Sequence, residues 1–251
     1  MAKRGYQKWL VIVLFIVGLL SVLYVLLMPD LSYLKKENPK KTALMEYREM
    51  ASKEKRKTYR IYQSWVSLSK ISPYLIKAVL IAEDDKFWKH EGFDYEAIQK
   101  AIEKDLKARK FKFGGSTITQ QLARNLYLSP EKILIRKISE AIITWRMERV
   151  LSKKRILELY LNVAEWGEGI FGAEAASRHY YGKSSSELTP QEAARLASVL
   201  PNPKRYNPAG EQRYVINRSN LIYSIMIQRG IVVPEYEETT ERGGEGGIPS
   251  Y

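Results

Sequence analysis

The chain has 251 residues, of which 45% are hydrophobic, and this suits one domain of ordinary size with appendages. It contains no cysteine and two histidines, which excludes disulfides and thiolate metal sites and argues against a histidine-rich metal site. The formal net charge of +13 predicts an anionic partner, such as nucleic acid, anionic lipid or a phosphorylated substrate.

The first element is an uncharged stretch over residues 9–28, preceded by a short tail over residues 1–8. At helical rise, its length matches a hydrocarbon core about 30 Å thick. The exit Met28-Pro29-Asp30 lacks the small residues of a signal-peptide cleavage site. We therefore predict an uncleaved transmembrane helix. Basic residues flank it on both sides, so charge alone does not orient it.

Residues 29–58 are polar and lysine-rich and predict a juxtamembrane linker, helical over residues 43–57. Such a segment is either solvated or lies on anionic headgroups, and we expect a mixture of the two. Residues 59–230 predict a mostly helical domain with weak strand signals near residues 60–66. Helix starts are indicated by Ser152 and by a hydroxyl residue before proline at Ser72, Ser129 and Thr189. Residues 231–251 are polar and read as a disordered tail.

Acidic residues gather unusually in the stretch from Ala82 to Asp94, within an otherwise basic chain. Glu83 follows the apolar, helix-like run 73–81, so its carboxylate can be partly desolvated. Desolvation raises a carboxyl pKa toward the range useful for proton transfer. The competing interpretation is a charged helix end stopped by Gly92.

A second stretch, residues 113–125, combines two glycines with neutral hydrogen-bonding side chains and then Arg124 and Asn125. Neutral donors beside a cation suit a sugar or a phosphate. The segment is not a P-loop, because no Gly-Lys-Ser/Thr ends it. Its alternative interpretation is a polar loop that caps a helix.

A third cluster lies inside a helix predicted over residues 130–150. Glu140 stands four residues after Arg136 and three after Lys137, so the three side chains can share one helix face. They form either an intrahelical ion pair worth about 0.3–0.5 kcal/mol or a carboxylate held beside two cations at a phosphate site.

Glu83 and Glu140 together match the paired carboxylates of glycosidic chemistry, although sequence does not give their separation. The nearby cations favour transfer over hydrolysis. A diphosphate leaving group needs a cationic clamp, which Arg124, Arg136 and Lys137 can supply, whereas a lysozyme-type hydrolase needs none.

In this order the motifs resemble the peptidoglycan glycosyltransferases of family 51, which polymerise lipid II. The resemblance covers roughly residues 72–208, and one departure is Arg124, where lysine is common in the family. The motifs are Glu83-Asp84 with Phe87, His90 and Gly92; Gly115-Ser116-Thr117-x-Thr119-Gln120-Gln121; Arg136-Lys137-x-x-Glu140; Arg155-Ile156-Leu157-x-x-Tyr160-Leu161-Asn162; and the Gly- and Tyr-containing segment 167–183.

The resemblance implies a mainly α, lysozyme-like glycosyltransferase domain with a small membrane-associated jaw lobe, plus the N-terminal transmembrane helix. It implies a single-pass protein of the bacterial cytoplasmic membrane, with a cytoplasmic N-terminus and the catalytic domain on the periplasmic or outer side. Ser67-x-x-Lys70 resembles a penicillin-binding motif, but no Lys-Thr-Gly follows, so we expect no transpeptidase activity.

For the site, the resemblance implies that Glu83 is the general base and that Glu140 is the second catalytic carboxylate, orienting cations or helping to hold a divalent metal. No cofactor is expected to be required, with Mg²⁺ or Mn²⁺ as the optional ion. Expected partners are lipid II, the growing lipid-linked glycan strand, the membrane and cell-wall synthesis or division proteins, but not nucleic acid. The residues expected to bind substrate are Asp84, Phe87, Ser116, Thr117, Gln120, Gln121, Arg124, Asn125, Arg136 and Lys137. Phe87 would shape the cleft and not react, and a purely core role for it is an equal alternative.

Two other functions remain open at this point. A lytic, muramidase-like enzyme of related fold would cleave finished peptidoglycan instead of polymerising lipid II. A basic, membrane-tethered binding protein would need only charge, which does not explain the uncharged segment over residues 115–121.

Overall fold

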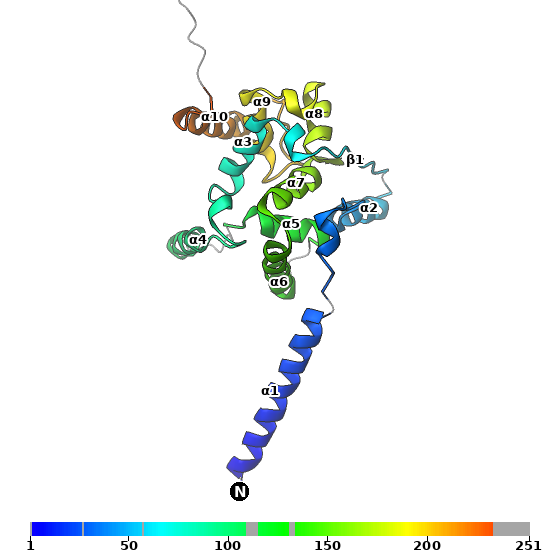
Figure 1. The fold of residues 1–251 in the computed structure, drawn as a ribbon, viewed down its shortest axis with the longest axis vertical. Coiled ribbons are helices and arrows are strands. Elements are labelled where there is room, and N and C mark those ends of the chain that lie inside the picture. Colours follow the sequence, from blue (N-terminus) through cyan, green and yellow to red (C-terminus); the bar gives the residue numbers. More distant parts are fainter. Residues whose placement is uncertain (1, 27, 57, 109–114, 131–133, 233–251) are drawn as a thin grey trace, which may run out of the picture.

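The computed structural model describes residues 2–26, 28–56, 58–108, 115–130 and 134–232, which form a mainly helical architecture (Figure 1). The α-helices run over Ala2–Leu26 (α1), Ala43–Glu54 (α2), Pro73–Glu83 (α3), Tyr95–Ala108 (α4), Ile118–Tyr127 (α5), Leu134–Val150 (α6), Lys153–Val163 (α7), Ala173–Tyr181 (α8), Pro190–Val199 (α9) and Arg213–Gln228 (α10). Short 3-10 turns occupy Ser32–Lys35 (η1), Leu68–Lys70 (η2), Phe87–Lys89 (η3) and Ser185–Glu187 (η4). The strands are Tyr62–Gln63 (β1), Glu165–Gly167 (β2) and Ile170–Phe171 (β3).

The helices of the body pack in two groups around α7. Helix α9 packs against both α3 and α10, while α5 packs against α2, α6 and α7. In Figure 1, α3, α8, α9 and α10 gather at one end of the body, and α4, α5 and α6 lie at the other. Helix α7 belongs to the core, because its residues 156, 157 and 159–163 are all buried.

Helix α3 begins at Pro73, as predicted, but Ser72 does not cap it through its side chain. The Ser72 hydroxyl instead donates to the carbonyl oxygen of Leu188 at 3.0 Å, which joins the helix start to the segment before α9. Four residues of α3, at positions 75 and 78–80, are buried. This apolar packing fixes the helix, and its last residue is Glu83.

Other predicted helix starts had mixed outcomes. Ser152 and Thr189 accept hydrogen bonds from backbone N–H groups in the first turns of α7 and α9, and Thr189 forms a reciprocal capping box with Glu192. The helix start predicted at Ser129-Pro130 is wrong, because Pro130 is not helical. Residues 131–133 fall outside the described part of the chain. The predicted C-terminal tail also lies outside the described part, from residue 233 onward.

The strand predicted near residues 60–66 is confirmed as β1, and it pairs in parallel with β3. Strand β3 also pairs antiparallel with β2, which completes a three-stranded sheet in the order β1-β3-β2. The sequence did not predict β2 or β3. They span two or three residues and are buried throughout, so they show no alternation of apolar and polar residues.

The segment predicted as a linker, residues 29–58, is folded onto the domain. Leu31 and Leu34 are fully buried and belong to the hydrophobic core, and Met45 on α2 is also buried. Helix α2 packs against α5. A few apolar residues spaced widely among lysines gave no periodic signal, which is why the sequence predicted a juxtamembrane linker outside the domain.

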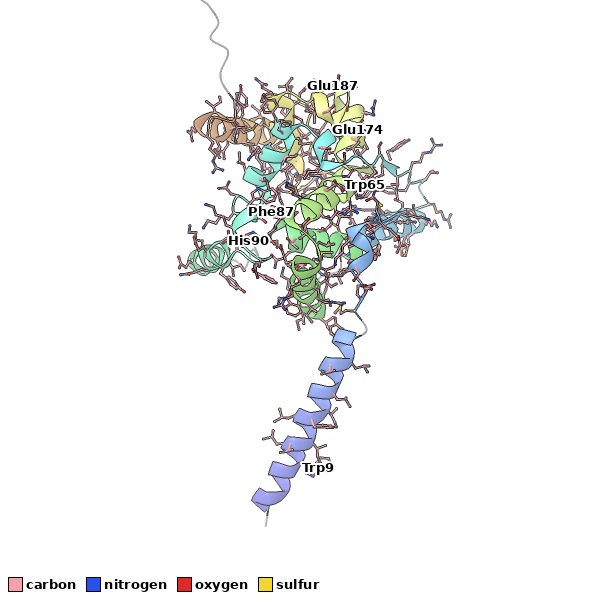
Figure 2. The ribbon with its side chains drawn as sticks, in the orientation of Figure 1. Trp9, Trp65, Phe87, His90, Glu174 and Glu187 are labelled. Atoms are coloured by element: carbon pink, nitrogen blue, oxygen red, sulfur yellow. The ribbon has the colours of Figure 1, made fainter. Side chains whose placement is uncertain are left out.

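Helix α1 extends away from the body (Figure 1), and its large apolar side chains from Trp9 to Ile16 are exposed. Figure 2 shows Trp9 far from the body that carries Phe87 and His90. Along the described stretches, no helix combines the length and hydropathy needed to cross a bilayer. The anchor over residues 9–28 therefore stays a prediction. The predicted tail over residues 1–8 is part of the same helix from Ala2 onward.

We predict that Asn162→Ala destabilises the fold by roughly 2–4 kcal/mol. The Asn162 side chain is fully buried, accepts from the N–H of Val66 at 3.0 Å and donates to the carbonyl oxygens of Val66 and Glu158. Its loss leaves these buried backbone groups without hydrogen-bond partners. Denaturant unfolding would measure the resulting loss in the free energy of unfolding. Gln99→Ala, on an exposed face of α4, is the matched control, and equal effects of the two substitutions would contradict the prediction.

Candidate active site

The carboxylate of Glu83 is held by one oxygen and free at the other. Its Oε2 accepts a hydrogen bond from Nε2 of Gln121 at 3.0 Å. Its Oε1 is buried and has no hydrogen-bond partner among the described residues, and the nearest cation is Nη2 of Arg218 at 3.8 Å. Burial raises the pKa of Glu83, and this outweighs the lowering by Gln121, Arg218 and Arg124. A fixed carboxylate with a raised pKa and one oxygen that makes no hydrogen bond suits a general base.

A hydrogen-bond chain from α7 orients the amide that holds Glu83. The buried Tyr160 hydroxyl donates to Oε1 of Gln121 at 3.0 Å, so the amide nitrogen of Gln121 faces Glu83. Burial raises the pKa of Tyr160 well above its ordinary value, which keeps this hydroxyl protonated as a donor. The side-chain orientation of the base therefore depends on three helices.

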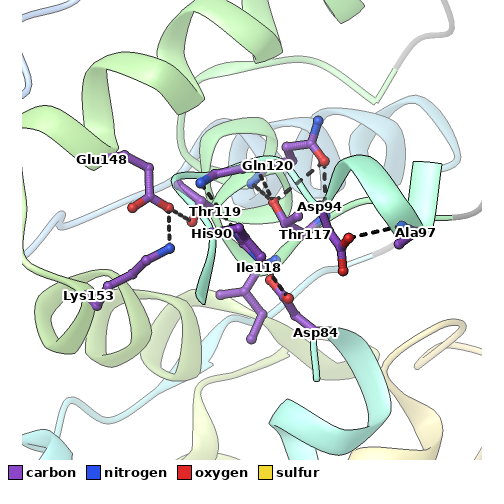
Figure 3. A network of polar contacts seen from close by, with 11 residues as sticks. Asp84, His90, Asp94, Ala97, Thr117, Ile118, Thr119, Gln120, Glu148 and Lys153 are labelled. Atoms are coloured by element: carbon purple, nitrogen blue, oxygen red, sulfur yellow. Dashed lines mark hydrogen bonds and ion pairs between the residues drawn. The ribbon is translucent and has the colours of Figure 1, made fainter. Parts of the chain in front are cut away.

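The residue after the base joins the following loop to the start of α5 (Figure 3). Oδ2 of Asp84 accepts from the backbone N–H of Ile118 at 2.9 Å, where the helix dipole also favours a carboxylate. Oδ1 of Asp84 lies 2.8 Å from Nε2 of His90. Because Nδ1 of His90 accepts from the N–H of Gly92 at 3.1 Å, we assign the ring proton to Nε2, which donates to Asp84. His90 thus fixes the loop through both ring nitrogens.

Gly92 closes this loop and requires glycine. Its φ is +86°, and a β-carbon there would lie 2.7 Å from Cγ2 of Thr144. Its carbonyl oxygen accepts from the hydroxyl of Thr117 at 2.7 Å. Thr117 also forms a reciprocal capping box with Gln120 at the start of α5. Both side chains are nearly fully buried and cap α5, while Thr117 also lines the hollow beside Glu83. Substrate contacts of Thr117 and Gln120 therefore stay predictions.

Phe87 does not line the site but packs beneath it. Its side chain is fully buried in the hydrophobic core, and Nζ of Lys153 lies 4.4 Å from its ring centroid. Lys153 also pairs with Glu148 at 2.8 Å, which in turn accepts from the hydroxyl of Thr119. The prediction that Phe87 binds substrate is therefore wrong, because a fully buried ring cannot reach a ligand.

Two hollows flank the Glu83–Gln121 hydrogen bond. The first, of ≈ 280 Å³, is lined by residues 81–86 with the carboxylate-bearing Glu83, and also by Lys100 and Ser116. The second, of ≈ 210 Å³, is lined by Gln121, Arg124 and Asn125. Ser116 and Asp84 thus lie on one side of the base, and Arg124 and Asn125 lie beyond Gln121.

The structure confirms that Arg136, Lys137 and Glu140 share one helix face. Glu140 is buried, and its carboxylate pairs with Lys137 and, at 3.5 Å, with Arg136. None of the three is among the described residues that line the two hollows. Within the described ranges, no group of three or more His, Cys, Asp or Glu side chains is arranged to hold a metal ion, so a cation at Glu140 stays a prediction.

An ion pair that the sequence did not predict borders the second hollow. Arg48 on α2 donates to Oε2 of Glu165 from Nη2 at 2.6 Å and from Nε at 3.1 Å. Glu165 is 6% exposed, and the hydroxyl of Tyr59 lies 3.5 Å from its Oε1. Burial raises the pKa of Glu165 despite the cation. The two residues are 117 positions apart, so no local pattern links them.

The chain has many relatives among known proteins. A sequence model described as transglycosylase matches residues 49–227, a segment that contains every site residue above except Arg48. A biosynthetic peptidoglycan transglycosylase of Nitrosospira multiformis is 43% identical over 229 residues, covering 91% of this chain and 98% of the relative. Enzymes of the same name from Dechloromonas aromatica and Methylobacillus flagellatus are 53% and 49% identical. These alignments cover 68% and 75% of this chain and 74% and 82% of the two relatives.

We predict that Arg48→Met destabilises the domain by about 3–5 kcal/mol, because it leaves a buried carboxylate without its cation. The double variant Arg48→Met/Glu165→Gln should regain much of this loss, since no charge then remains to be paired. Denaturant unfolding of the two variants and of Glu165→Gln alone measures the coupling. Purely additive effects would contradict a direct pairing of Arg48 with Glu165.

The raised pKa of Glu83 also predicts how stability depends on pH. The folded chain binds a proton at Glu83 more tightly than the unfolded chain does, so the free energy of unfolding falls as pH rises from the ordinary value of 4.5 through the folded value. Glu83→Gln removes this dependence. We expect the Tm of the variant minus that of the wild type to be larger at neutral pH than at about pH 4. Glu91→Gln, in the exposed loop, is the control, and a difference that stays constant with pH would refute the raised value.

Proposed function

The chain belongs to the transglycosylase family, and we propose that it is a peptidoglycan glycosyltransferase that polymerises lipid II into β-1,4-linked glycan strands. Undecaprenyl diphosphate is the leaving group in this proposal, and the configuration at the reacting sugar carbon is inverted. The observation that carries the proposal is the half-held carboxylate of Glu83, beside a hollow lined by polar groups.

Glu83 acts as the general base. Its free Oε1 takes the proton from the 4-hydroxyl of the acceptor GlcNAc, and that oxygen forms a bond to C1 of the terminal MurNAc on the lipid-linked strand. The C1–O bond to the diphosphate breaks, and its electron pair leaves with the diphosphate. The hydrogen bond from Gln121 to Oε2 supports this role, because it fixes the carboxylate without occupying the oxygen that reacts.

Cations on the other side of Gln121 stabilise the departing diphosphate. Arg124 lines the second hollow with Asn125, and no carboxylate lies within ion-pair distance of its guanidinium among the described residues. A guanidinium in that state is free to bind phosphate oxygens in a bidentate manner. Ser116 and Gln121 provide further polar contacts to the substrate.

Arg136, Lys137 and Glu140 extend the cationic side of the site. The buried Glu140 carboxylate orients both cations, which contribute to diphosphate binding when the long substrate occupies the site. Mg²⁺ or Mn²⁺ at Glu140 is the optional addition to this arrangement.

We also propose that the enzyme is anchored in the bacterial cytoplasmic membrane by residues 9–28, with a cytoplasmic N-terminus and the body on the periplasmic or outer side. The uncharged sequence and the exposed apolar side chains of α1 support the anchor. In this proposal the body is a lysozyme-like domain with a small, membrane-associated jaw lobe. The enzyme meets lipid II, the growing strand and other cell-wall synthesis or division proteins at that surface.

The test is polymerisation of labelled lipid II by the purified full-length protein. We expect Glu83→Gln to lose about 10²–10⁴-fold in kcat, the contribution typical of a general base, while Glu91→Gln stays active. Near-wild-type polymerisation by Glu83→Gln would remove Glu83 as the base. Cleavage of finished glycan without polymerisation would instead identify a lytic enzyme.

A further inference from the structure

Arg218, on the last helix of the body, reaches the backbone and the side chain at the end of α3. Its Nη2 donates to the carbonyl oxygen of Ala82 at 3.1 Å and lies 3.8 Å from Oε1 of Glu83. The two side chains are 31% and 11% exposed, so water screens this contact less than it screens a surface ion pair. Ala82 and Arg218 are 136 positions apart, and the motifs of the sequence do not include Arg218.

The geometry of this contact differs from that of an ordinary salt bridge. Nε of Arg218 and Oε1 of Glu83 are both buried and lack a hydrogen-bond partner within the described ranges. At 3.8 Å the guanidinium attracts the carboxylate through charge but does not occupy Oε1 with a hydrogen bond. A tighter pair would have consumed the oxygen that must accept a proton.

A second ion pair fastens the same helix to the same loop. Arg229, directly after α10, donates to Asp85 through both terminal nitrogens, at 2.5 and 3.0 Å. Asp85 follows Glu83 by two residues. Helix α10 is thus fixed beside the base both at Arg218 and at its C-terminal end, and it also packs against α3.

We propose that Arg218 is a positioning residue for the transfer reaction, which holds Glu83 in its orientation and in its ionised state from helix α10. It is not among the described residues that line the hollows, so it acts through Glu83 and not on the substrate. The inference rests on the proposed function, because it takes Glu83 as the general base.

The charged and polar groups that face Glu83 determine how its pKa responds to the loss of Arg218. These are Arg218 from α10, Arg124 and Gln121 from α5, Tyr160 from α7 and the adjacent Asp84. Burial raises the pKa of Glu83, and Arg218 lowers it more than Arg124 does. Loss of the Arg218 charge should therefore raise the pKa of Glu83 further.

The experiment compares kcat and KM for lipid II over a range of pH in the full-length wild type and Arg218→Gln. We expect the acid limb of the kcat profile to move up by about one pH unit and kcat on that limb to fall about tenfold, with KM within about twofold. Arg218→Lys keeps the charge and should leave the limb close to its wild-type position. Arg229→Gln removes the second fastening on the same helix and should not move the limb, because Arg229 pairs with Asp85 and not with Glu83.

A readout without turnover separates this inference from the function on which it rests. The ¹³C resonance of the Glu83 carboxyl, assigned by its absence in Glu83→Gln, reports the pKa of Glu83 directly. An unchanged titration in Arg218→Gln, with a loss of Tm like that of Arg229→Gln, would overturn the positioning role. If Arg218→Gln does not fold, Arg218→Met, which keeps most of the side-chain length without the charge, takes its place, and an unchanged titration of Glu83 there overturns the positioning role. Unimpaired polymerisation by Glu83→Gln would remove Glu83 as the general base, while the titration still tests the contact between Arg218 and Glu83.

Discussion

The hydrogen bond between Gln121 and Glu83 joins the helices on which the site depends. Helix α3 supplies the carboxylate at its last residue, α5 supplies the amide, and α7 orients that amide through Tyr160. A buried carboxylate with an unpaired oxygen is unfavourable for stability. The apolar packing of α3 and α7 holds it in place nevertheless, so the site keeps an unsatisfied acceptor where chemistry requires one.

The loop after Glu83 is constrained as tightly as the helices. Asp84 accepts hydrogen bonds from the backbone N–H of Ile118 on α5 and from the ring N–H of His90 (Figure 3). Gly92 and Thr117 close the loop onto the same helix start through their own hydrogen bond. The residues of the motif that begins at Glu83 therefore have two different roles. Glu83 faces a hollow, whereas Asp84 and His90 hold the loop that follows Glu83.

Local features of the fold could be predicted from the sequence, and long-range ones could not. Proline and hydroxyl residues identified the starts of α3, α7 and α9. The spacing of Arg136, Lys137 and Glu140 predicted that they share one helix face. Both kinds of signal act within one helical turn, so they can be recognised in the sequence. Tertiary packing brings Arg48 to Glu165 and Arg218 to Glu83, so no local sequence pattern predicted these two contacts. The sequence left open whether Phe87 lines the cleft or fills the core, because an aromatic residue in a motif has the same sequence signature in both cases, and the structure buries it.

The burial of Leu31 and Leu34 has a consequence for how the proposed enzyme reaches its substrate. Helix α1 ends at Leu26, and five residues later the chain is already inside the core of the body. That connection spans at most about 17 Å when fully extended, and the hydroxyls of Tyr24 on α1 and Ser139 on α6 are hydrogen-bonded. An enzyme anchored by α1 would have no slack with which to search above the bilayer. Lipid-linked sugars would have to arrive by lateral diffusion at a fixed height, and the lengthening strand would have to slide past a stationary catalyst.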